Sequence, residues 1–268
     1  MPSAEVLAPH LRGARLLALN SPLNPCGTVF TAEALGAICD LVLEENARSS
    51  KAERPLYLMY DQVYWTLCFG ETAHVTPPEL VPEVARYTVF VDGISKAFAA
   101  TGLRVGWGVG PVDVISRMSA VLGHLGAWAL RAEQVATVGL LDDPEAIRAY
   151  QKVFLGQLQL RLDRLHAGLQ AMKGRGLPVE SIPPMGAMYL TTRIHPFGKR
   201  TPSGETLRTN SDVRRYVLEA AGIGIVPFQA FGSIEDEGWF RLSIGAVSPA
   251  EIDAALPGLE EALSLLTD

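Results

Sequence analysis

The chain has 268 residues, 48% hydrophobic and 19% charged, which is enough apolar sequence to fill one large core or two modest ones. Its formal net charge of -6 argues against the clustered basic surface that a nucleic-acid backbone requires. The amino terminus lacks the charged start and apolar core of a signal peptide, and no run of about 18 residues is free of charge or glycine. We therefore expect a protein that is neither exported nor membrane-spanning.

The cysteines and histidines argue against disulfides and metal. Cys26, Cys39 and Cys68 show no CxxC spacing, and the five histidines have no His or Cys neighbour at the spacing of metal ligands. We expect neither a disulfide framework nor a metal site. An odd set of unpaired cysteines fits a reducing compartment, which predicts a cytoplasmic protein.

In the first half of the chain, apolar runs are separated by helical segments and lead into polar loops. A helix capped by Thr31 is expected to fray over 46–50. The connection before the last apolar run is too short for a parallel crossover, so three parallel strands and one antiparallel strand are predicted. The predicted strands cover residues 14–20, 55–61, 87–92 and 104–110.

The loop over 21–27 contains two prolines and a glycine, which neither a helix nor a central strand accepts. Strands alternating with helices describe an open, mostly parallel α/β sheet, whose site lies beyond the carboxyl ends of the strands. Asn24 and Lys96 follow predicted strands, and Asp61 is the last residue of one, so all three lie at that edge of the sheet. We expect them in the site.

The second half predicts a smaller carboxyl-terminal α+β domain. Apolar residues spaced by threes and fours predict a long helix over 143–172, and Ser248 with Glu251 forms a capping box that starts a final helix ending near 266. Between them we expect strands over 179–182, 187–191, 224–227 and 239–245, and a helix near 212–221. The predicted division is a partial large domain over 1–142, a linking helix over 143–175 and a small domain over 176–268.

Lys96 is the residue with the clearest chemical potential. An amine at a strand end, near another cation such as Arg104, can lose its proton near neutral pH and attack a carbonyl to form a Schiff base. Taken alone, a lysine is more often a solvated surface charge. The neighbouring motifs decide between these interpretations.

Four motifs occur in a meaningful order: residues 20–27, residues 61–64, Ser95-Lys96 with Arg104, and residues 240–245. Together they resemble the class I/II pyridoxal-phosphate-dependent aminotransferases, the aspartate aminotransferase superfamily. The resemblance implies that family's large domain and its smaller carboxyl-terminal domain. Members of the family carry a further segment before the Asn-Pro loop that this sequence does not contain. The resemblance therefore covers only the later two thirds of a family member and lacks its amino-terminal third.

The resemblance implies that the cofactor is pyridoxal 5'-phosphate. It also implies that three residues of this chain act on the cofactor in catalysis. Lys96 would hold the cofactor as a Schiff base and later act as the general base. Asp61 would keep the pyridine nitrogen protonated, and Tyr64 would donate to the ring 3-oxygen. Taken alone, Asp61 could be a helix-capping or turn acid and Tyr64 a core aromatic residue.

The remaining implied contacts involve anions and the ring oxygen. Ser95 and Arg104 would bind the cofactor, with Arg104 on its phosphate, and Arg241 would bind the substrate α-carboxylate, because a planar guanidinium meets two oxygens at once. Asn24 would contact both cofactor and substrate, although Asn beside Pro is also common in turns. Both arginines could be surface salt bridges, but a buried Arg241 in an apolar strand needs an anion.

Two positions depart from the family pattern. Gly93 stands where a phosphate-binding serine is common, and Cys26 replaces the usual Thr or Ser. Both predict weaker affinity for phosphate. The strands that the missing segment would supply are also absent, which predicts open sheet edges.

We expect an aminotransferase that moves an amino group from an amino acid to a 2-oxo acid, impaired by the missing segment. Two alternatives stay open: a β-elimination lyase of the same fold, and a catalytically silent remnant that associates through its open edges. The expected partners are small substrates and, once the missing segment is supplied, a second copy. Trp128, Arg131 and Tyr189 resemble substrate-side residues but read as packing or surface positions, so they are left out of the predicted site.

Overall fold

The computed structural model describes residues 1–48 and 54–268, which form two compact units. The first unit comprises Met1–Leu23 and Thr28–Lys152, and the second comprises Asn24–Gly27 and Val153–Asp268. A four-residue loop that follows the first strand therefore belongs with the carboxyl-terminal half. The domain limits expected from the sequence stay a prediction.

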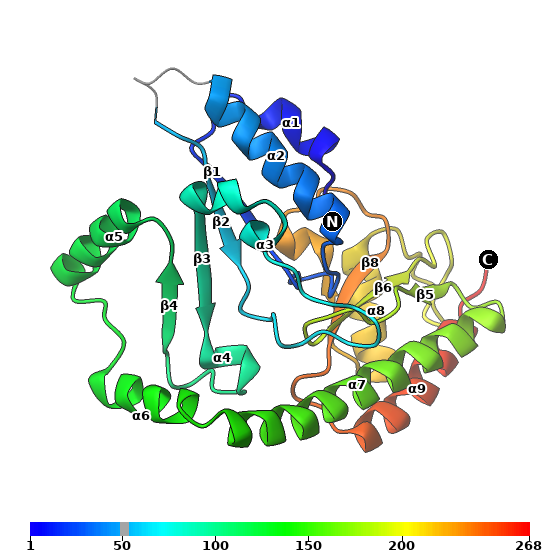
Figure 1. Ribbon diagram of the computed structural model, residues 1–268. Coiled ribbons are helices and arrows are strands. Elements are labelled where there is room, and N and C mark those ends of the chain that lie inside the picture. The colour runs from blue at the N-terminus through cyan, green and yellow to red at the C-terminus, as the bar shows by residue number, and fades with distance from the viewer. Residues whose placement is uncertain (49–53) are drawn as a thin grey trace. The chain divides into compact units, whose positions relative to one another are not determined.

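The first unit is an open α/β sheet with strand order β1-β2-β3-β4 (Figure 1). The first three strands run parallel and β4 runs antiparallel to β3, as the sequence predicts. Strands β1, β2 and β4 are shorter than expected, whereas β3 has the expected length and is shifted by one residue. The tail of the predicted helix, residues 49 and 50, lies outside the described residues. The strands are β1 (Leu16–Asn20), β2 (Tyr57–Asp61), β3 (Thr88–Gly93) and β4 (Gly106–Val109).

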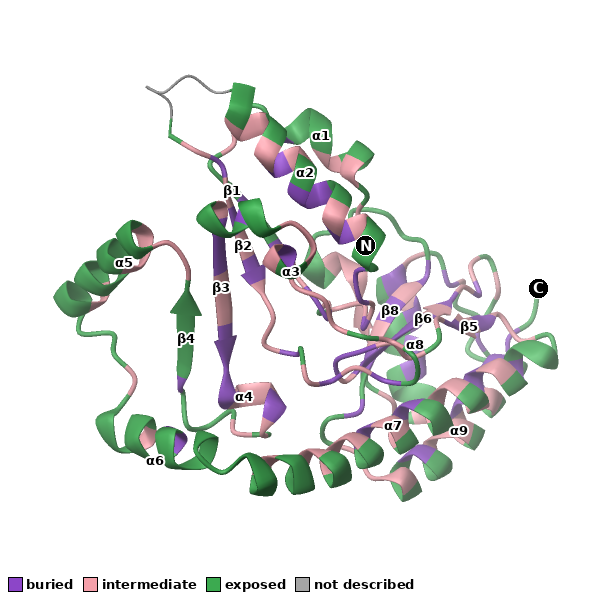
Figure 2. Ribbon diagram, viewed as in Figure 1, coloured by how far each residue is buried: buried purple, intermediate pink, exposed green. Residues whose placement is uncertain are grey.

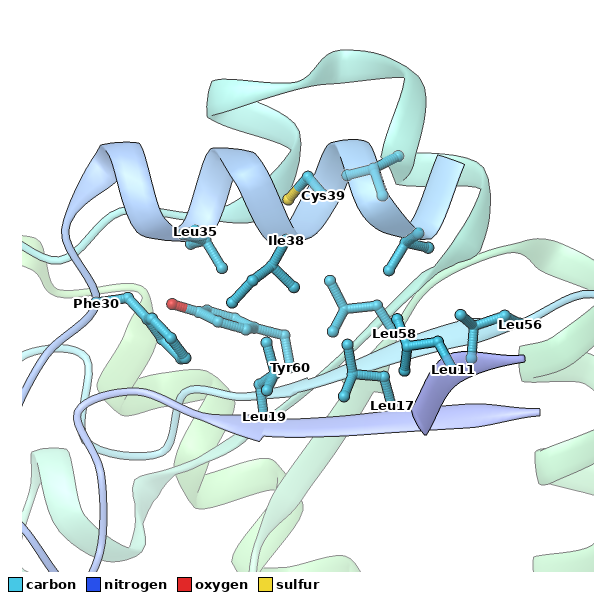
Figure 3. Packing of buried hydrophobic residues seen from close by; sticks show 12 residues of the cluster. Leu11, Leu17, Leu19, Phe30, Leu35, Ile38, Cys39, Leu56, Leu58 and Tyr60 are labelled. Atoms are coloured by element: carbon cyan, nitrogen blue, oxygen red, sulfur yellow. The ribbon is translucent and has the colours of Figure 1, made fainter. Parts of the chain in front are cut away.

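The main core of the first unit lies between helix α2 (Ala32–Arg48) and strands β1 and β2 (Figure 3). Residues at helical spacing on α2 point onto the sheet, and alternate residues of the strands point back. The cluster includes Leu17, Leu19, Leu35, Ile38, Leu58 and Tyr60. Its burial fixes the register of the strands whose carboxyl ends carry the candidate site.

Strands β3 and β4 approach each other closely because glycines face each other across the pair. Gly93 is paired with Gly106. A Cβ atom on Gly93 would lie 2.8 Å from the carbonyl oxygen of Val105, and one on Gly106 would lie 2.9 Å from that of Asp92. A serine at position 93 therefore requires the backbone to move, which gives this departure from the family pattern a structural reason.

The first unit also contains helices that the sequence analysis did not assign. They are α1 (Ala4–Leu11), α3 (Pro77–Leu80), η1 (Pro82–Tyr87), α4 (Ile94–Ala97), α5 (Val112–Leu125) and α6 (Arg131–Leu141). Helix α5 begins after Pro111 and ends at Gly126, which takes a left-handed conformation (φ 64°). The expected start of the fourth strand at Arg104 is wrong, because Arg104 has a φ of 57° and β4 begins two residues later.

The second unit contains an antiparallel sheet of order β5-β6-β8-β7, α-helices and a short 3-10 helix, an α+β arrangement as expected. Capping boxes start two of the helices, at Thr209 and at Ser248. Strand β6 begins later than predicted, because Ala187 takes a positive φ of 59°. The elements are α7 (Pro144–Gly174, its last part in this unit), β5 (Val179–Ser181), β6 (Tyr189–Ile194), α8 (Asn210–Ala221), β7 (Val226–Pro227), η2 (Phe228–Phe231), β8 (Trp239–Ser243) and α9 (Pro249–Ser264).

Two kinds of feature are absent from residues 1–48 and 54–268. None of the helices there has the length and apolar character needed to cross a bilayer. Within the same residues, no group of three or more His, Cys, Asp or Glu side chains is placed to hold a metal ion.

Candidate active site

The first group of candidate residues lies at the carboxyl ends of β1 and β2. Asn20 pairs with Asp61 in the parallel register. The Asn20 side-chain amide donates to the carbonyl oxygen of Asp61 at 2.9 Å, and the Ser21 amide donates to the same oxygen at 3.0 Å. These bonds hold the end of β2 in place and fix the backbone that carries the Asp61 carboxylate.

A tight turn after β2 places Tyr64. Asp61 Oδ1 accepts a hydrogen bond from the Val63 amide at 3.0 Å, and the Gln62 amide donates to the Val91 carbonyl at 3.0 Å. This Asx-type turn folds the chain back on the sheet, so that Tyr64 is only 4% exposed. Asp61 thus acts as a turn acid, the alternative to a catalytic role that the sequence left open. The turn uses only one of its two carboxylate oxygens, Oδ1.

Lys96 lies against Tyr64. The lysine sits on the short helix α4, directly after β3, and its Nζ lies 5.8 Å from the centroid of the Tyr64 ring. Ser95, partly buried, precedes it on the same helix. Tyr64 and Lys96 are therefore brought together by two segments that are distant in sequence.

A second carboxylate, Asp92, joins this group although the sequence analysis did not select it. Asp92 is the second-last residue of β3, close to the strand end as Asp61 is in β2, and it is only 9% exposed. It accepts hydrogen bonds from the Gly93 amide at 2.7 Å and from Gln62 Nε2 at 3.4 Å. Burial raises the pKa of Asp92, and the nearby negative charge of Asp61 raises it further. Its strand-end position was the signal that could have identified it.

Arg104 is exposed and is held by its own turn. Its Nη1 donates to the Thr101 carbonyl at 2.9 Å, and the residue takes a left-handed backbone conformation just before β4. The structure thus places Arg104 between α4 and β4. Its guanidinium reaches a carbonyl rather than a carboxylate there.

The second unit brings together Arg241 and Asn24, the two residues expected to contact a substrate. Arg241 lies on β8, opposite Thr191 of β6. Its Nη1 donates to Asn24 Oδ1 at 2.8 Å. These residues are 217 positions apart in sequence, so only the folded chain reveals the pair.

Two aromatic rings flank the Arg241 guanidinium. Its central carbon lies 4.6 Å from the centroid of the Tyr189 ring and 4.7 Å from that of Phe231. Its Nε is buried and has no hydrogen-bond partner within the described part of the chain. Stacking of this kind fixes the guanidinium plane and leaves donors for an anion. Tyr189 was set aside as a packing residue and Phe231 was missed, because cross-strand register decides both contacts.

A buried amide network sets the position of Phe231. Asn210, 2% exposed, donates from its side chain to Gln229 Oε1 at 2.9 Å and accepts from the Gly238 amide at 2.9 Å. Gln229 lies on η2 and also donates to Asp236 Oδ1 at 3.0 Å. These bonds tie both ends of the segment that carries Phe231 to the start of α8.

The loop that carries Asn24 is held by β6 and the turn before it. Thr191 Oγ1 donates to the Cys26 carbonyl at 2.8 Å, and the Gly186 amide donates to the Gly27 carbonyl at 2.9 Å. Gly27 takes a φ of 66°, and a Cβ there would overlap the Tyr189 carbonyl oxygen. Burial raises the pKa of the Cys26 thiol. The loop is thus fixed by main-chain contacts that demand glycine at its end.

One partly buried histidine of the first unit lies outside the predicted set. The His74 ring packs against Tyr60 and Trp65, with centroid distances of 5.8 and 6.5 Å. Both of its ring nitrogens are buried and find no hydrogen-bond partner among residues 1–48 and 54–268. Burial lowers the pKa of His74 to about 4. The ring is therefore neutral at physiological pH.

Comparison with known proteins gives consistent matches. The family model described as aminotransferase class I and II matches residues 4–259. An aspartate aminotransferase of Rhizobium meliloti is 32% identical over 94% of this chain, and an aspartate/prephenate aminotransferase of Thermus thermophilus is 32% identical over 82% of it. Among solved structures, the Rhizobium meliloti aspartate aminotransferase superposes over the whole chain with a TM-score of 0.87 at 29% identity. An aromatic aminotransferase of Pyrococcus horikoshii covers 98% with a TM-score of 0.84 at 26% identity.

These proteins are longer than the chain described here. The chain spans 57% of the Rhizobium meliloti sequence and 51% of the Thermus thermophilus sequence that it matches. It spans 62% of the Rhizobium meliloti structure and 64% of the Pyrococcus horikoshii structure. More than a third of each relative thus has no counterpart in this sequence.

Proposed function

Because the chain belongs to the aminotransferase class I and II family, we propose that it is an aminotransferase, moving an amino group from an amino acid to a 2-oxo acid. The observation that supports this most directly is the placement of Lys96 against Tyr64, beside the strand end that carries Asp61. Relatives named aspartate aminotransferase make aspartate the first amino donor to test.

The residues of the first unit fit the cofactor of this family, pyridoxal 5'-phosphate. The cofactor carries an aldehyde, a ring hydroxyl, a ring nitrogen and a phosphate, and the first unit offers an amine, a phenol, a carboxylate and a guanidinium in Lys96, Tyr64, Asp61 and Arg104. Ser95 adds a hydroxyl beside Lys96. When bound, the cofactor supplies an electron sink for the carbanion that forms at the substrate Cα.

Each of these side chains has one proposed task. Lys96 would hold the cofactor covalently through its Nζ, with loss of water from the aldehyde, and, once released, would move a proton at the substrate Cα. Asp61 holds the proton on the ring nitrogen, because a carboxylate stabilises a neighbouring cation. Tyr64 would donate a hydrogen bond from its hydroxyl to the ring oxygen, and Arg104 and Ser95 would bind the phosphate.

In the second unit, Arg241 and Asn24 bind the substrate α-carboxylate. The guanidinium already donates to Asn24 Oδ1, and its flanked plane keeps further donors directed at one anion. The buried Nε without an acceptor among the described residues supports this task, because an unsatisfied buried donor is costly unless a ligand meets it. The carboxylate is held in two-point contact, which fixes the orientation of the Cα–H bond.

The test is the absorbance spectrum of the purified protein with pyridoxal 5'-phosphate, before and after borohydride. We expect a Schiff-base band that Lys96→Ala abolishes and that the control Lys152→Ala, at an exposed lysine, leaves intact. A protein without the band, or a Lys96→Ala variant that keeps it, would refute the proposed role of Lys96.

Product analysis separates the aminotransferase from its alternatives. Formation of glutamate and oxaloacetate from aspartate and 2-oxoglutarate supports the proposal. Release of a thiol and ammonia from cystathionine, without amino transfer, would instead identify a β-elimination lyase. Absence of both reactions, together with absence of the cofactor band, would identify a silent remnant.

Two broader parts of the proposal concern assembly and location. We place the protein in the cytoplasm, supported by its three free thiols, Cys26, Cys39 and Cys68. We also expect a homodimer once the part of the relatives that this sequence does not match is supplied. Light scattering measures the molar mass, and thus the oligomeric state, of the chain supplied with that unmatched part.

A further inference from the structure

Asp92 is a buried acidic residue near the candidate site to which the proposed function gives no task. Figure 2 colours the end of β3 that leads into α4 as buried, and Asp92 lies there. Burial and the negative charge of Asp61 both raise the pKa of Asp92, because the ionised form is disfavoured in such a place. The cost of burying a carboxylate is compensated only by the hydrogen bonds that it accepts. The donors to Asp92 therefore indicate what it does.

One oxygen of Asp92 fixes the start of α4. The Gly93 amide donates to Asp92 Oδ1 at 2.7 Å, and Gly93 is the N-cap residue of α4, the helix that carries Lys96. The next amide, that of Ile94, donates to the Val105 carbonyl at 3.3 Å. Both amides that lead into the helix are thus held. The path of the backbone towards Lys96 is set in part by Asp92.

The other oxygen of Asp92 faces the turn that follows β2. Gln62 Nε2 donates to Asp92 Oδ2 at 3.4 Å, and the side chain of Trp65 also hydrogen-bonds the carboxylate. Gln62 and Trp65 lie on either side of Tyr64 in the chain, and the Trp65 amide donates to the Gln62 carbonyl at 2.8 Å. Two side chains that flank Tyr64 in this turn are therefore bound to one carboxylate.

The relative position of Tyr64 and Lys96 depends on these contacts. The strand register pairs Asp61 with Val91, but Tyr64 and Lys96 both lie beyond the strand ends. Tyr64 is nevertheless buried, and Lys96 Nζ lies 5.8 Å from the centroid of its ring. Because a displacement of about 1 Å can lower the rate of a positioned reaction by about 100-fold, this spacing matters for chemistry.

We propose that Asp92 is a positioning residue, which holds Tyr64 and Lys96 at the spacing that the reaction requires by binding the two segments that carry them. Asp92 acts through Gln62 and Gly93 and takes no part in proton transfer. The inference rests on the proposed function for the chemistry of Tyr64 and Lys96. The geometry that it assigns to Asp92 exists without the cofactor, so it can be tested separately.

The pair formed by Gln62 and Asp92 allows an exchange of chemical groups. Gln62 Oε1 is buried and finds no hydrogen-bond partner in the part of the chain that the structure describes. Gln62→Glu places a second carboxylate against Asp92, and at about pH 8 the two charges repel each other. Asp92→Asn, added to Gln62→Glu, moves the amide donor to the other side of the pair and restores a hydrogen bond at almost unchanged volume.

The first measurement is nuclear magnetic resonance of the intact chain without cofactor, with isotope-labelled lysine. The aromatic ring of Tyr64 shifts the side-chain resonance of Lys96, which is identified by its loss in Lys96→Ala. We expect Gln62→Glu and Asp92→Ala to lose most of this shift and the double variant to recover it. Gln157→Glu makes the same change at an exposed glutamine and should leave the resonance in place. Gln62→Glu keeps the Gly93 contact, so it tests the link if Asp92→Ala unfolds.

The second measurement is the pH at which the Schiff-base band of the cofactor-loaded chain changes its absorbance maximum. A hydrogen bond from Tyr64 stabilises the anionic ring oxygen, so displacement of Tyr64 in Gln62→Glu should raise that pH by about one unit. The double variant should return it to the value of the parent protein. A loss of stability alone would lower the melting temperature without moving this pH, so the readout separates positioning from folding.

The outcomes distinguish this inference from the proposed function. A parent chain without a Schiff-base band would refute the role of Lys96, and the Lys96 resonance would still decide whether Asp92 positions it. An unchanged resonance in Gln62→Glu and Asp92→Ala would overturn the inference. So would a double variant that fails to recover the resonance, or a resonance that moves while the pH of the band stays at the parent value.

Discussion

The Arg241 guanidinium and the Asn24 side chain form a hydrogen bond of 2.8 Å across 217 positions of sequence. The bond orients the guanidinium. A carboxylate that accepts from this guanidinium receives charge-assisted hydrogen bonds from a planar donor group.

Replacement of either residue should weaken substrate binding to different degrees. Arg241→Lys keeps the charge but loses the planar fork, so we expect kcat/KM for aspartate to fall by about 100-fold, mainly through KM. Asn24→Ala removes one hydrogen bond and should lower kcat/KM for aspartate by about tenfold. Steady-state kinetics measures both effects on the cofactor-loaded chain supplied with the segment that only its longer relatives contain. An unchanged KM in Arg241→Lys would contradict the proposal that Arg241 binds the substrate carboxylate.

Phe231 is expected to act by positioning Arg241. Phe231→Ala removes one of the two flanking rings and should raise KM by about five- to tenfold with little change in kcat, since cation–π contacts contribute roughly 1 kcal/mol. Phe231→Tyr keeps the ring and should restore KM. If the alanine variant lowers kcat alone, or the tyrosine variant fails to restore KM, the ring does not work through the guanidinium.

Gly93 should resist substitution by the serine common in the family. Gly93→Ser places a Cβ 2.8 Å from the Val105 carbonyl oxygen, so we expect a loss of about 1–3 kcal/mol in the free energy of unfolding. Gly102→Ala is the control, because a Cβ there meets nothing within 4 Å. Urea unfolding compares the two; equal midpoints for Gly93→Ser and the parent protein would show that β3 and β4 can separate at no cost.

His74 should make stability depend on pH. Burial lowers its pKa from 6.5 to about 4 in the folded chain, so the unfolded chain binds the proton more readily. The stability present above pH 6.5 is therefore lost progressively as the pH falls towards 4. The His74→Phe variant, which keeps an aromatic ring beside Tyr60, should lose this part of the dependence. Urea unfolding midpoints at pH 7.5 and pH 5 measure this pH dependence of stability. The prediction is contradicted if the midpoint changes by the same amount between the two pH values in the parent protein and in His74→Phe.

The parts of the fold that follow from sequence are those in which burial sets a repeating pattern. Strands β1, β2 and β3 and helix α2 are recognisable because one face of each is packed in the core. Helices α5 and α6 have apolar residues at helical spacing too, but only Thr137 among them is buried, so no core constrains that pattern.

The candidate site divides in the same way. Lys96 and Asp61 are found from their positions at or just after the ends of strands, because the carboxyl ends of parallel strands lie at one edge of a sheet. The contacts of Arg241 with Tyr189 and Phe231 depend on the β6–β8 register and on the network around Asn210, which local sequence does not encode. The left-handed conformation of Arg104 also arises from tertiary context, since the sequence there favours a strand.

The loop Asn24–Gly27 gives this protein an unusual covalent layout, because the residues on both sides of it belong to the first unit. The backbone passes from one unit to the other three times, before Asn24, after Gly27 and between Lys152 and Val153. A gene fragment encoding only residues 153–268 would yield Arg241 deprived of its amide neighbour, and protease nicking inside α7 would leave both products tethered through that short insertion. Dissecting this molecule into autonomous modules therefore requires a new connection that joins residues 24–27 to residues 153–268, rather than a single cut.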